Sequence, residues 1–205
     1  MELYYGRMSG NSSRAVFGLN ECGVKYDARL VDTQKGENKS SEYRALNPMG
    51  KIPAFRDGAL TLWESNAINF YVAEKHAPQL LGSNKAAVLR WCFFQAGHVT
   101  PACVPIFRHT NAAVKAFWKT DGGSEASEAG KKELSRYLPV LDDALEGRDW
   151  LEGTFTLADV AYAPHFALIR EGGFDFAQYA NLSRWLDRLL ARPAWLAARE
   201  TVFGG

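Results

Sequence analysis

The sequence predicts two regions of different fold class, an α/β region over residues 1–79 and an all-helical region over 86–205, joined by a linker at 80–85. Two observations lead to this division. Short runs with the pattern of β-strands alternate with helical runs as far as Pro78, and beyond Lys85 only helical periodicity is found. The 205 residues are also enough for two small domains that each bury a core.

We expect the α/β region to follow the order β-α-β-α-β-β-α. Asp57-Gly58 supplies a tight hairpin turn between the last two strands, and apolar residues from Ala67 to Val72 recur at helical spacing after them. Such an order gives a mixed four-stranded sheet with helices on both faces. The expected elements are strand 2–5, helix 13–20, strand 26–31, helix 40–46, strands 52–55 and 60–63, and helix 65–75.

The all-helical region is divided by turn-forming residues. The sequence DGGS at 121–124 separates the first two helices, and glycines close the next two. Pro101 and Pro105 should bend or interrupt the first long helix. The expected helices cover 86–111, 125–145, 156–169 and 181–190, with a short piece after Pro193.

The composition excludes several classes of protein. Lys and Arg total 24 against 23 Asp and Glu, and this net charge of +1 argues against a dedicated nucleic-acid binder. No apolar run approaches the ~20 residues that cross a bilayer, and the N-terminal residues lack the apolar segment of a secretory signal. We therefore expect a cytoplasmic protein with no membrane partner.

The cysteines and histidines give no sign of a metal or redox centre. The three cysteines form no CxxC pair and are odd in number, which fits neither a disulfide framework nor a zinc site. His76 and His109 have no partner at the spacing of metal ligands. We therefore expect no metal and no resident cofactor.

The sharpest local signal is the segment Asn47-Pro48-Met49-Gly50-Lys51-Ile52-Pro53 before the third strand. Pro53 has no amide proton and can adopt a cis peptide bond, which would turn the N–H and C=O of Ile52 outward. An exposed pair of this kind can bind an extended peptide as an additional strand. The alternative interpretation of this segment is a simple turn.

A helix that starts near Ser65 offers N–H groups and a dipole that favour a carboxylate, and Glu64 beside it could hold an ammonium group. Taken alone, Ser65 is equally explained as an N-cap and Glu64 as a solvated turn residue. Combined with an edge at Ile52 that holds a peptide backbone, the three residues predict a site for a small zwitterionic peptide.

The loop after the first strand, Ser9-Gly10-Asn11-Ser12-Ser13-Arg14, is rich in hydroxyl groups. A thiol with a pKa near ~8.5 becomes a good nucleophile at neutral pH when hydroxyl and amide donors stabilise its thiolate. Ser9 could supply such a donor. The alternative is that these serines cap the helix or solvate the loop.

These motifs, in this order, resemble the cytosolic glutathione S-transferases over essentially the full chain. Two further segments match that family: Gly36-Glu37-Asn38-Lys39-Ser40, and Thr156-Leu157-Ala158-Asp159-Val160-Ala161, which looks like the family's buried capping box formed by Thr156 and Asp159. The resemblance implies a thioredoxin-like N-terminal domain with the glutathione site and a helical C-terminal domain with most of the electrophile pocket. The loop resembles that of the bacterial-type, serine-loop members, which are theta-, zeta-, tau- or phi-like, and the class within the family stays open.

The resemblance also assigns roles within the glutathione site. Ile52 beside a cis Pro53 would hold the cysteinyl backbone, and Glu64 with Ser65 the γ-glutamyl end. Ser9 would donate to the thiolate; since the loop length is ambiguous by one residue, Asn11 or Ser12 are alternatives. The glycyl carboxylate would be bound by Lys39 and Asn38, assisted by Lys51.

The expected activity is conjugation of glutathione, as co-substrate, to a small hydrophobic electrophile. Aromatic and basic residues of the first long C-terminal helix, with His98, Phe107 and Arg108 foremost, would form the electrophile pocket. Isomerisation, dehalogenation and peroxide reduction use the same thiolate and stay open, as does a binding or assembly module without turnover. The resemblance further implies a homodimer, for which Tyr71, Arg90 and Trp91 are candidate contacts.

Overall fold

The computed structural model describes residues 1–204, and their contacts divide the chain into two compact units. The first unit comprises Met1–Leu81 and the C-terminal residues from Pro193 onward, and the second comprises Gly82–Arg192. The division after Leu81 lies within the linker expected at 80–85. The segment from Pro193, which we placed with the helical region, packs in the first unit instead.

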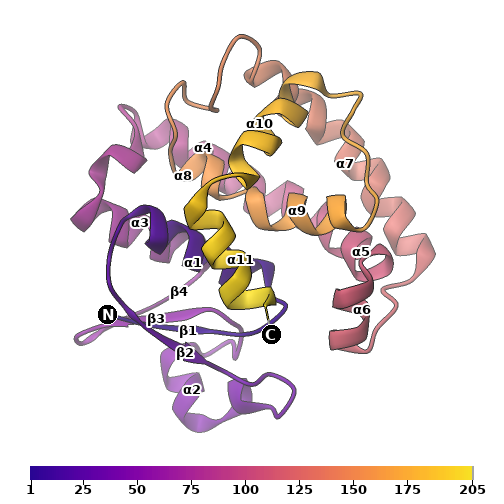
Figure 1. Ribbon diagram of the computed structural model, residues 1–205. Coiled ribbons are helices and arrows are strands. Elements are labelled where there is room, and N and C mark those ends of the chain that lie inside the picture. The colour runs from indigo at the N-terminus through magenta and orange to yellow at the C-terminus, as the bar shows by residue number, and fades with distance from the viewer. Residues whose placement is uncertain (205) are drawn as a thin grey trace. The chain divides into compact units, whose positions relative to one another are not determined.

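The first unit is built on a four-stranded mixed sheet in the order β2-β1-β3-β4 (Figure 1). β1 pairs with β2 in parallel and with β3 antiparallel, and β3 pairs antiparallel with β4. The central residues Leu3 and Phe55, which face each other in the register, are fully buried. The predicted mixed sheet is confirmed. The strands are β1 (Glu2–Tyr5), β2 (Asp27–Leu30), β3 (Ala54–Asp57) and β4 (Leu60–Trp63).

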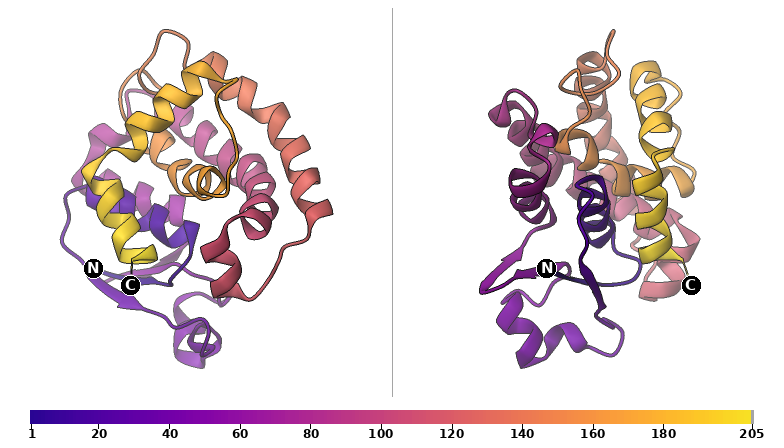
Figure 2. Two further views of the ribbon diagram at one scale, coloured as in Figure 1. Left: turned by 45° about the vertical axis from the view of Figure 1, so that its right-hand side comes forward. Right: turned by 60° about the vertical axis from the view of Figure 1, so that its left-hand side comes forward.

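Helices cover both faces of this sheet, with α2 on one side and α1, α3 and α11 on the other (Figures 1 and 2). α1 packs closely on α3 because Gly18 leaves room for the Asn69 side chain, which a β-carbon at position 18 would overlap. α11 lies along α1, where Phe17 and Trp195 meet edge to face with ring centroids 5.7 Å apart. The helices are α1 (Gly10–Glu21), α2 (Ser41–Leu46), α3 (Ser65–His76) and α11 (Pro193–Phe203), with 3-10 turns η1 (Glu37–Lys39) and η2 (Pro78–Leu81).

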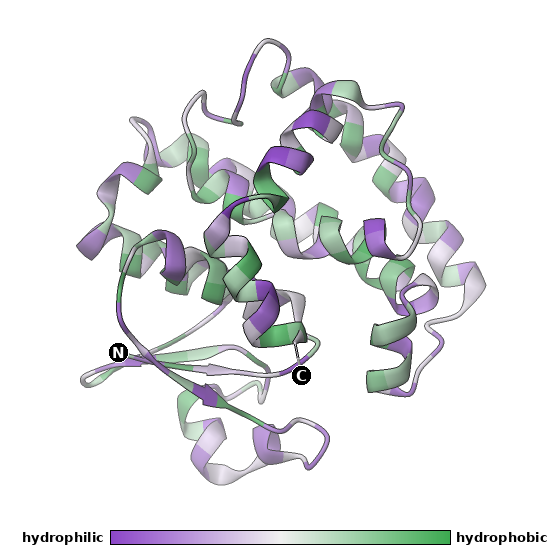
Figure 3. Ribbon diagram, viewed as in Figure 1, coloured by the Kyte–Doolittle hydropathy of each residue, from purple (hydrophilic) through white to green (hydrophobic). Residues whose placement is uncertain are grey.

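The described residues of the second unit form an assembly of helices in which hydrophobic and hydrophilic residues are interspersed (Figure 3). α5 lies at its centre and contacts both α7 and α9. The elements are α4 (Lys85–Phe94), η3 (Gln95–Val99), α5 (Thr100–Thr110), α6 (Ala112–Trp118), α7 (Ser124–Ala144), α8 (Leu157–Val160), α9 (Ala163–Glu171) and α10 (Ala180–Leu190).

Three differences from the predicted helices have physical causes. The long helix expected over 86–111 is interrupted by the π-helical turn η3, directly before Pro101 in the first turn of α5. The helix expected over 156–169 is two helices, because the capped turn α8 ends before α9 begins. The short helix α6, capped by the Asn111 side chain, was not predicted. No helix within residues 1–204 combines the length and apolar character that crossing a membrane requires.

Candidate functional site

The start of α1 places the hydroxyl group of Ser9 at the edge of the site. Ser9 is the N-cap residue, and its Oγ accepts a hydrogen bond from the Ser12 N–H at 3.1 Å. Its carbonyl accepts from the Ser13 N–H at 2.9 Å. Because the oxygen already accepts and no acceptor within residues 1–204 takes the hydroxyl hydrogen, Ser9 can still donate to a ligand.

The two alternatives to Ser9 differ in exposure. Ser12 is fully buried, and its Oγ accepts from the Gly6 N–H at 3.1 Å. Its hydroxyl group therefore has a structural role and does not reach a ligand. Asn11 is exposed, and its Oδ1 accepts from Arg14 at 2.8 Å. Ser9 and Asn11 are thus the members of the predicted trio that reach the surface.

The segment before β3 presents the backbone of Ile52. The Ile52-Pro53 peptide bond is cis. The preceding carbonyl, that of Lys51, accepts from the Tyr43 hydroxyl and from Asn47 Nδ2, both at 2.7 Å. These two hydrogen bonds fix the conformation of the segment. Within the described residues no hydrogen bond uses the N–H or C=O of Ile52 itself. A role of this pair in binding an extended peptide stays a prediction.

Gly6 brings the α1 loop and the Ile52 loop together. A β-carbon on Gly6 would overlap Cδ1 of Ile52, so the absence of a side chain lets the two segments touch. The N–H of Gly6 also donates to Ser12 Oγ in the first turn of α1. The start of α1 and the segment that carries Ile52 are therefore neighbours through one glycine.

The start of α3 supplies Glu64 and Ser65. Glu64 is exposed and has a positive φ of 70°, a conformation that costs a residue with a side chain roughly 1–3 kcal/mol. Ser65 is 4% exposed, and its Oγ accepts from Arg14 Nη1 at 2.9 Å. The buried hydrogen bond from Arg14 ties the first turn of α3 to α1 and helps to offset the strain at Glu64.

The basic residues of the candidate site lie on two segments that are tied together. Asn38 Nδ2 donates to the Gly50 carbonyl at 2.7 Å, which joins η1 to the loop that carries Lys51. Asn38 therefore fixes the loop through its amide nitrogen. Lys39 at the end of η1 and Lys51 are both exposed. Within residues 1–204 neither lysine has an ion-pair partner, and the two lie on adjoining segments.

Two family descriptions match the chain: "Glutathione S-transferase, N-terminal domain" over residues 1–74 and "Glutathione S-transferase, C-terminal domain" over residues 96–193. The chain belongs to the glutathione S-transferase family. The matched segments together cover most of the 205 residues.

Curated relatives and solved structures agree with this membership. This glutathione S-transferase is 30% identical to probable glutathione S-transferase GSTF2 of Oryza sativa subsp. japonica, over 95% of this chain and 93% of the relative. It is 31% identical to glutathione S-transferase F10 of Arabidopsis thaliana, with 93% of each covered. The crystal structure of glutathione transferase F2 from Populus trichocarpa matches with a TM-score of 0.88 at 27% identity, over 100% of this chain and 99% of that one.

Arg14 is the residue of the candidate site whose contacts the sequence analysis did not predict. It was named there only as the last residue of the hydroxyl-rich loop. In this glutathione S-transferase it is 3% exposed and joins Asn11 to Ser65. The only sequence signal was the spacing Ser9-x-x-x-x-Arg14, because Ser65 lies 51 residues away.

The three cysteines of the chain, all within the described residues, are buried and form no disulfide bond. Burial raises the pKa of the Cys22 thiol to about 12, and Cys92 and Cys103 are also buried. A protonated buried thiol is a poor nucleophile. Tyr4 and Tyr5 lie within β1, as expected from the sequence.

The residues predicted for the electrophile pocket are dispersed in the second unit. His98 is exposed on η3, with its ring 5.6 Å from that of Phe94 and 5.5 Å from that of Tyr137, and it lines a cavity of about 440 Å³. Phe107 is buried against His165. Arg108 is exposed, and neither it nor Phe107 lines that cavity.

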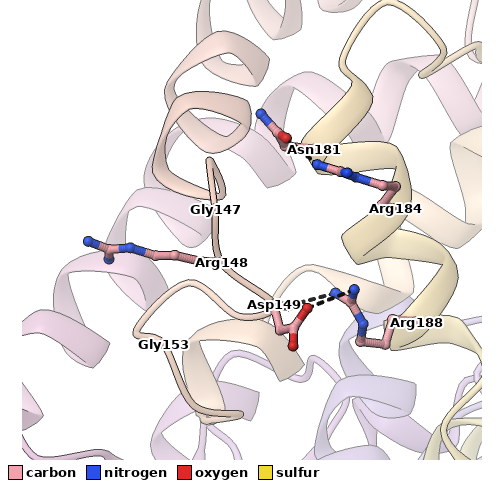
Figure 4. A pocket seen from close by; sticks show the side chains of 7 residues that line it. All are labelled: Gly147, Arg148, Asp149, Gly153, Asn181, Arg184 and Arg188. Carbon is pink, nitrogen blue, oxygen red and sulfur yellow. Dashed lines mark hydrogen bonds and ion pairs between the residues drawn. The ribbon is translucent and has the colours of Figure 1, made fainter.

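A second cavity of about 430 Å³ lies between α10 and the loop that follows α7 (Figure 4). Arg188 pairs with the Asp149 carboxylate at 2.9 Å, and Arg184 donates to Asn181 Oδ1 at 2.5 Å. Figure 4 shows Arg148 extending away from these pairs. None of the predicted site residues lines this cavity.

The capping box of α8 is complete and buried. Thr156 Oγ1 accepts from the Ala158 N–H at 3.2 Å, and Asp159 Oδ2 accepts from the Thr156 N–H at 2.9 Å. Asp159 Oδ1 also accepts from the Leu151 N–H at 3.0 Å and from Trp185 Nε1 at 2.9 Å. Burial raises the pKa of Asp159 to about 6, although these donors oppose the shift.

Proposed function

We propose that this protein binds glutathione in its first unit, stabilises the thiolate through the Ser9 hydroxyl group, and conjugates it to a small hydrophobic electrophile. The observation that carries the proposal is the Ser9 side chain, which accepts from the backbone of α1 and keeps its own hydrogen for a ligand. Two of the similar solved structures contain glutathione or a derivative of it. These are glutathione S-transferase-I with lactoylglutathione, and a theta class enzyme of Xanthomonas axonopodis pv. citri with glutathione.

Binding uses the backbone of Ile52, the start of α3 and the exposed lysines. The N–H and C=O of Ile52 pair with the cysteinyl backbone of glutathione, in the manner of an added strand. The first turn of α3 and the Ser65 hydroxyl receive the γ-glutamyl carboxylate, and Glu64 receives the ammonium group. Lys39 and Lys51 attract the glycyl carboxylate, while Asn38 holds their two segments together.

Activation depends on the position of the bound sulfur at the start of α1. A hydroxyl donor and the positive end of the helix both favour the thiolate over the thiol, so the thiol pKa falls and its proton passes to solvent. The sulfur lone pair then forms a C–S bond to the electrophilic carbon. A leaving group departs with its bonding electrons, or a proton is added where the electrophile is an activated double bond. Glutathione is a co-substrate here and no resident cofactor is needed.

Kinetics of Ser9→Ala would test this function. With glutathione and a chlorodinitrobenzene as substrates, we expect kcat/KM to fall by roughly 10²-fold, which is typical for the loss of one preorganised donor. Ser9→Thr, which keeps a hydroxyl group, should retain most of the activity. Ser13→Ala is the matched control, because that neighbouring hydroxyl is buried and donates to the Gly10 carbonyl. Equal activity of Ser9→Ala and wild type would refute the assignment, and glutathione binding without any turnover would favour the binding-module alternative.

We further propose that the protein forms a homodimer. Exposed apolar side chains on α4 support this proposal, with Phe93 72% and Leu89 37% exposed. Trp91 supports it less than expected, because it is buried and donates to Glu152 at 2.7 Å. Light scattering should give twice the chain mass for wild type and a lower mass for Phe93→Ser. A monomeric wild type at micromolar concentration would contradict the proposal.

A further inference from the structure

A buried arginine joins two parts of the candidate site, the start of α1 and the start of α3. Arg14 is 3% exposed and lies in the second turn of α1. Its Nη1 atom is 2.8 Å from Asn11 Oδ1 and 2.9 Å from Ser65 Oγ. Asn11 belongs to the sulfur end of the site and Ser65 to the γ-glutamyl end. One guanidinium group therefore contacts both ends.

The contact decides which way the hydrogen bonds of both partners run. A guanidinium group carries N–H donors and no acceptor, so each partner must accept from it. The amide of Asn11 turns its oxygen toward Arg14, and its NH₂ group consequently points away, on an exposed residue. The Ser65 oxygen likewise accepts, which leaves its only hydrogen for another acceptor. Without such a cation both side chains could act as donor or acceptor.

We propose that Arg14 is a positioning residue that holds Asn11 and Ser65 as hydrogen-bond donors, Asn11 toward the glutathione sulfur and Ser65 toward the γ-glutamyl carboxylate. The inference rests on the proposed function, because it requires glutathione in this site. Both ligand groups are anionic when glutathione reacts, and donors are what an anion needs. Arg14 acts through Asn11 and Ser65.

A second hydrogen bond of Arg14, made by its backbone carbonyl, offers a control for a purely structural role. Asn69 of α3 donates from Nδ2 to the Arg14 carbonyl at 3.0 Å, and it is 2% exposed. This hydrogen bond joins α1 to α3 at Arg14, and it involves neither Asn11 nor Ser65. Asn69→Ala should therefore loosen the same helix pair while the two donors keep their orientation.

The test compares wild type with Arg14→Gln, Arg14→Lys and Asn69→Ala in two measurements on the folded proteins. The first is the pH titration of thiolate absorbance of bound glutathione, which reports the sulfur end. The second is calorimetric binding of S-methylglutathione, which has no thiol and reports the γ-glutamyl end. Thermal unfolding followed by circular dichroism establishes that each variant is folded at the temperature used.

We expect Arg14→Gln to raise the thiol pKa of bound glutathione toward that of the free peptide and to weaken S-methylglutathione binding about tenfold. Arg14→Lys, which is also a pure donor, should restore much of both values. Asn69→Ala should lower the unfolding temperature and leave both values unchanged. Asn11→Ala should raise the thiol pKa in wild type and have little further effect in Arg14→Gln.

Two results would overturn the inference, and they differ from failure of the function itself. If Arg14→Gln is less stable but keeps the wild-type thiol pKa and S-methylglutathione affinity, the arginine is structural only. The same conclusion follows if Asn69→Ala shifts both values as strongly as Arg14→Gln does. If wild type binds neither glutathione nor S-methylglutathione, the proposed function is wrong and the role of Arg14 is wrong with it.

Discussion

Each unit of this protein buries a charged side chain near the start of a helix, and the two charges are satisfied in opposite ways. In the second unit, Asp159 accepts from Leu151, from Thr156 and from Trp185, all buried in the same unit. In the first unit, Arg14 donates to Asn11, which is exposed, and to Ser65, whose hydrogen is left unused. The first network is closed within the protein and the second is open at one side.

This difference separates stability from ligand binding. A closed network of buried donors and acceptors specifies the local fold, and its loss leaves unpaired groups in the interior. An open network directs hydrogen-bond donors to the surface, where a ligand completes it. The comparison predicts that variants around Asp159 change unfolding, whereas variants of the site in the first unit change glutathione chemistry.

The largest expected effect is on stability in the second unit. Asp159→Asn puts an NH₂ group in place of one oxygen, so the donors at that oxygen, either Leu151 and Trp185 at Oδ1 or Thr156 at Oδ2, lose their acceptor. We expect the free energy of unfolding at pH 7 to fall by about 2–4 kcal/mol, measured by urea denaturation. Asp149→Asn, which removes an exposed carboxylate paired with Arg188, is the control and should cost less than ~0.5 kcal/mol. A similar loss for both variants would break the comparison.

The same carboxyl group should make stability depend on pH. Burial raises the pKa of Asp159 from 3.8 to about 6, so the folded state holds the proton between those values and the unfolded state does not. Its stabilising contribution is therefore complete below pH ~4 and is lost as the pH rises through about 6. The difference in unfolding free energy between wild type and Asp159→Asn should shrink by up to about 3 kcal/mol from pH 4 to pH 7. A constant difference would show that Asp159 does not titrate in this range.

The smallest expected effect concerns the exposed cations of the first unit. Lys39→Gln and Lys51→Gln should each raise the KM for glutathione by about two- to fivefold, because an exposed ion pair contributes only ~0.2–1 kcal/mol. The increase should diminish at high salt, where such pairs are screened. Lys131→Gln on α7, an exposed lysine paired with Glu128, is the control. If the rise in KM did not depend on salt, the lysines would instead contact glutathione directly in a site from which water is excluded.

The parts of the molecule that local chemistry determines were predictable from the sequence. The turn at Asp57-Gly58, the Ile52-Pro53 segment and the capping box at Thr156 and Asp159 each depend on residues a few positions apart, and all are present in the structure. Strands β1 and β4 have the bounds that alternation predicts. The fold class of both regions was therefore predictable.

What depends on packing between distant segments was not. The bond from Arg14 to Ser65, the burial of Ser12 and the packing of α11 on α1 all arise from tertiary contacts that no local spacing reveals. Phe107 was expected in the electrophile pocket from its aromatic character, but the same character also suits the interior position it occupies. Helical periodicity in a sequence identifies the apolar face of a helix, but it does not identify the segment or ligand that this face contacts.

The thiol pKa of bound glutathione, measured by thiolate absorbance in wild type and Ser9→Ala, tests the central claim most directly. With Asp159→Asn as the control at a temperature where it is folded, we expect wild type and Asp159→Asn to bind glutathione with a pKa about one unit or more below that of the free thiol. Ser9→Ala should still bind glutathione but with a pKa near the free value. Equal thiol pKa values in wild type and Ser9→Ala would contradict the assignment of Ser9 as the thiolate donor.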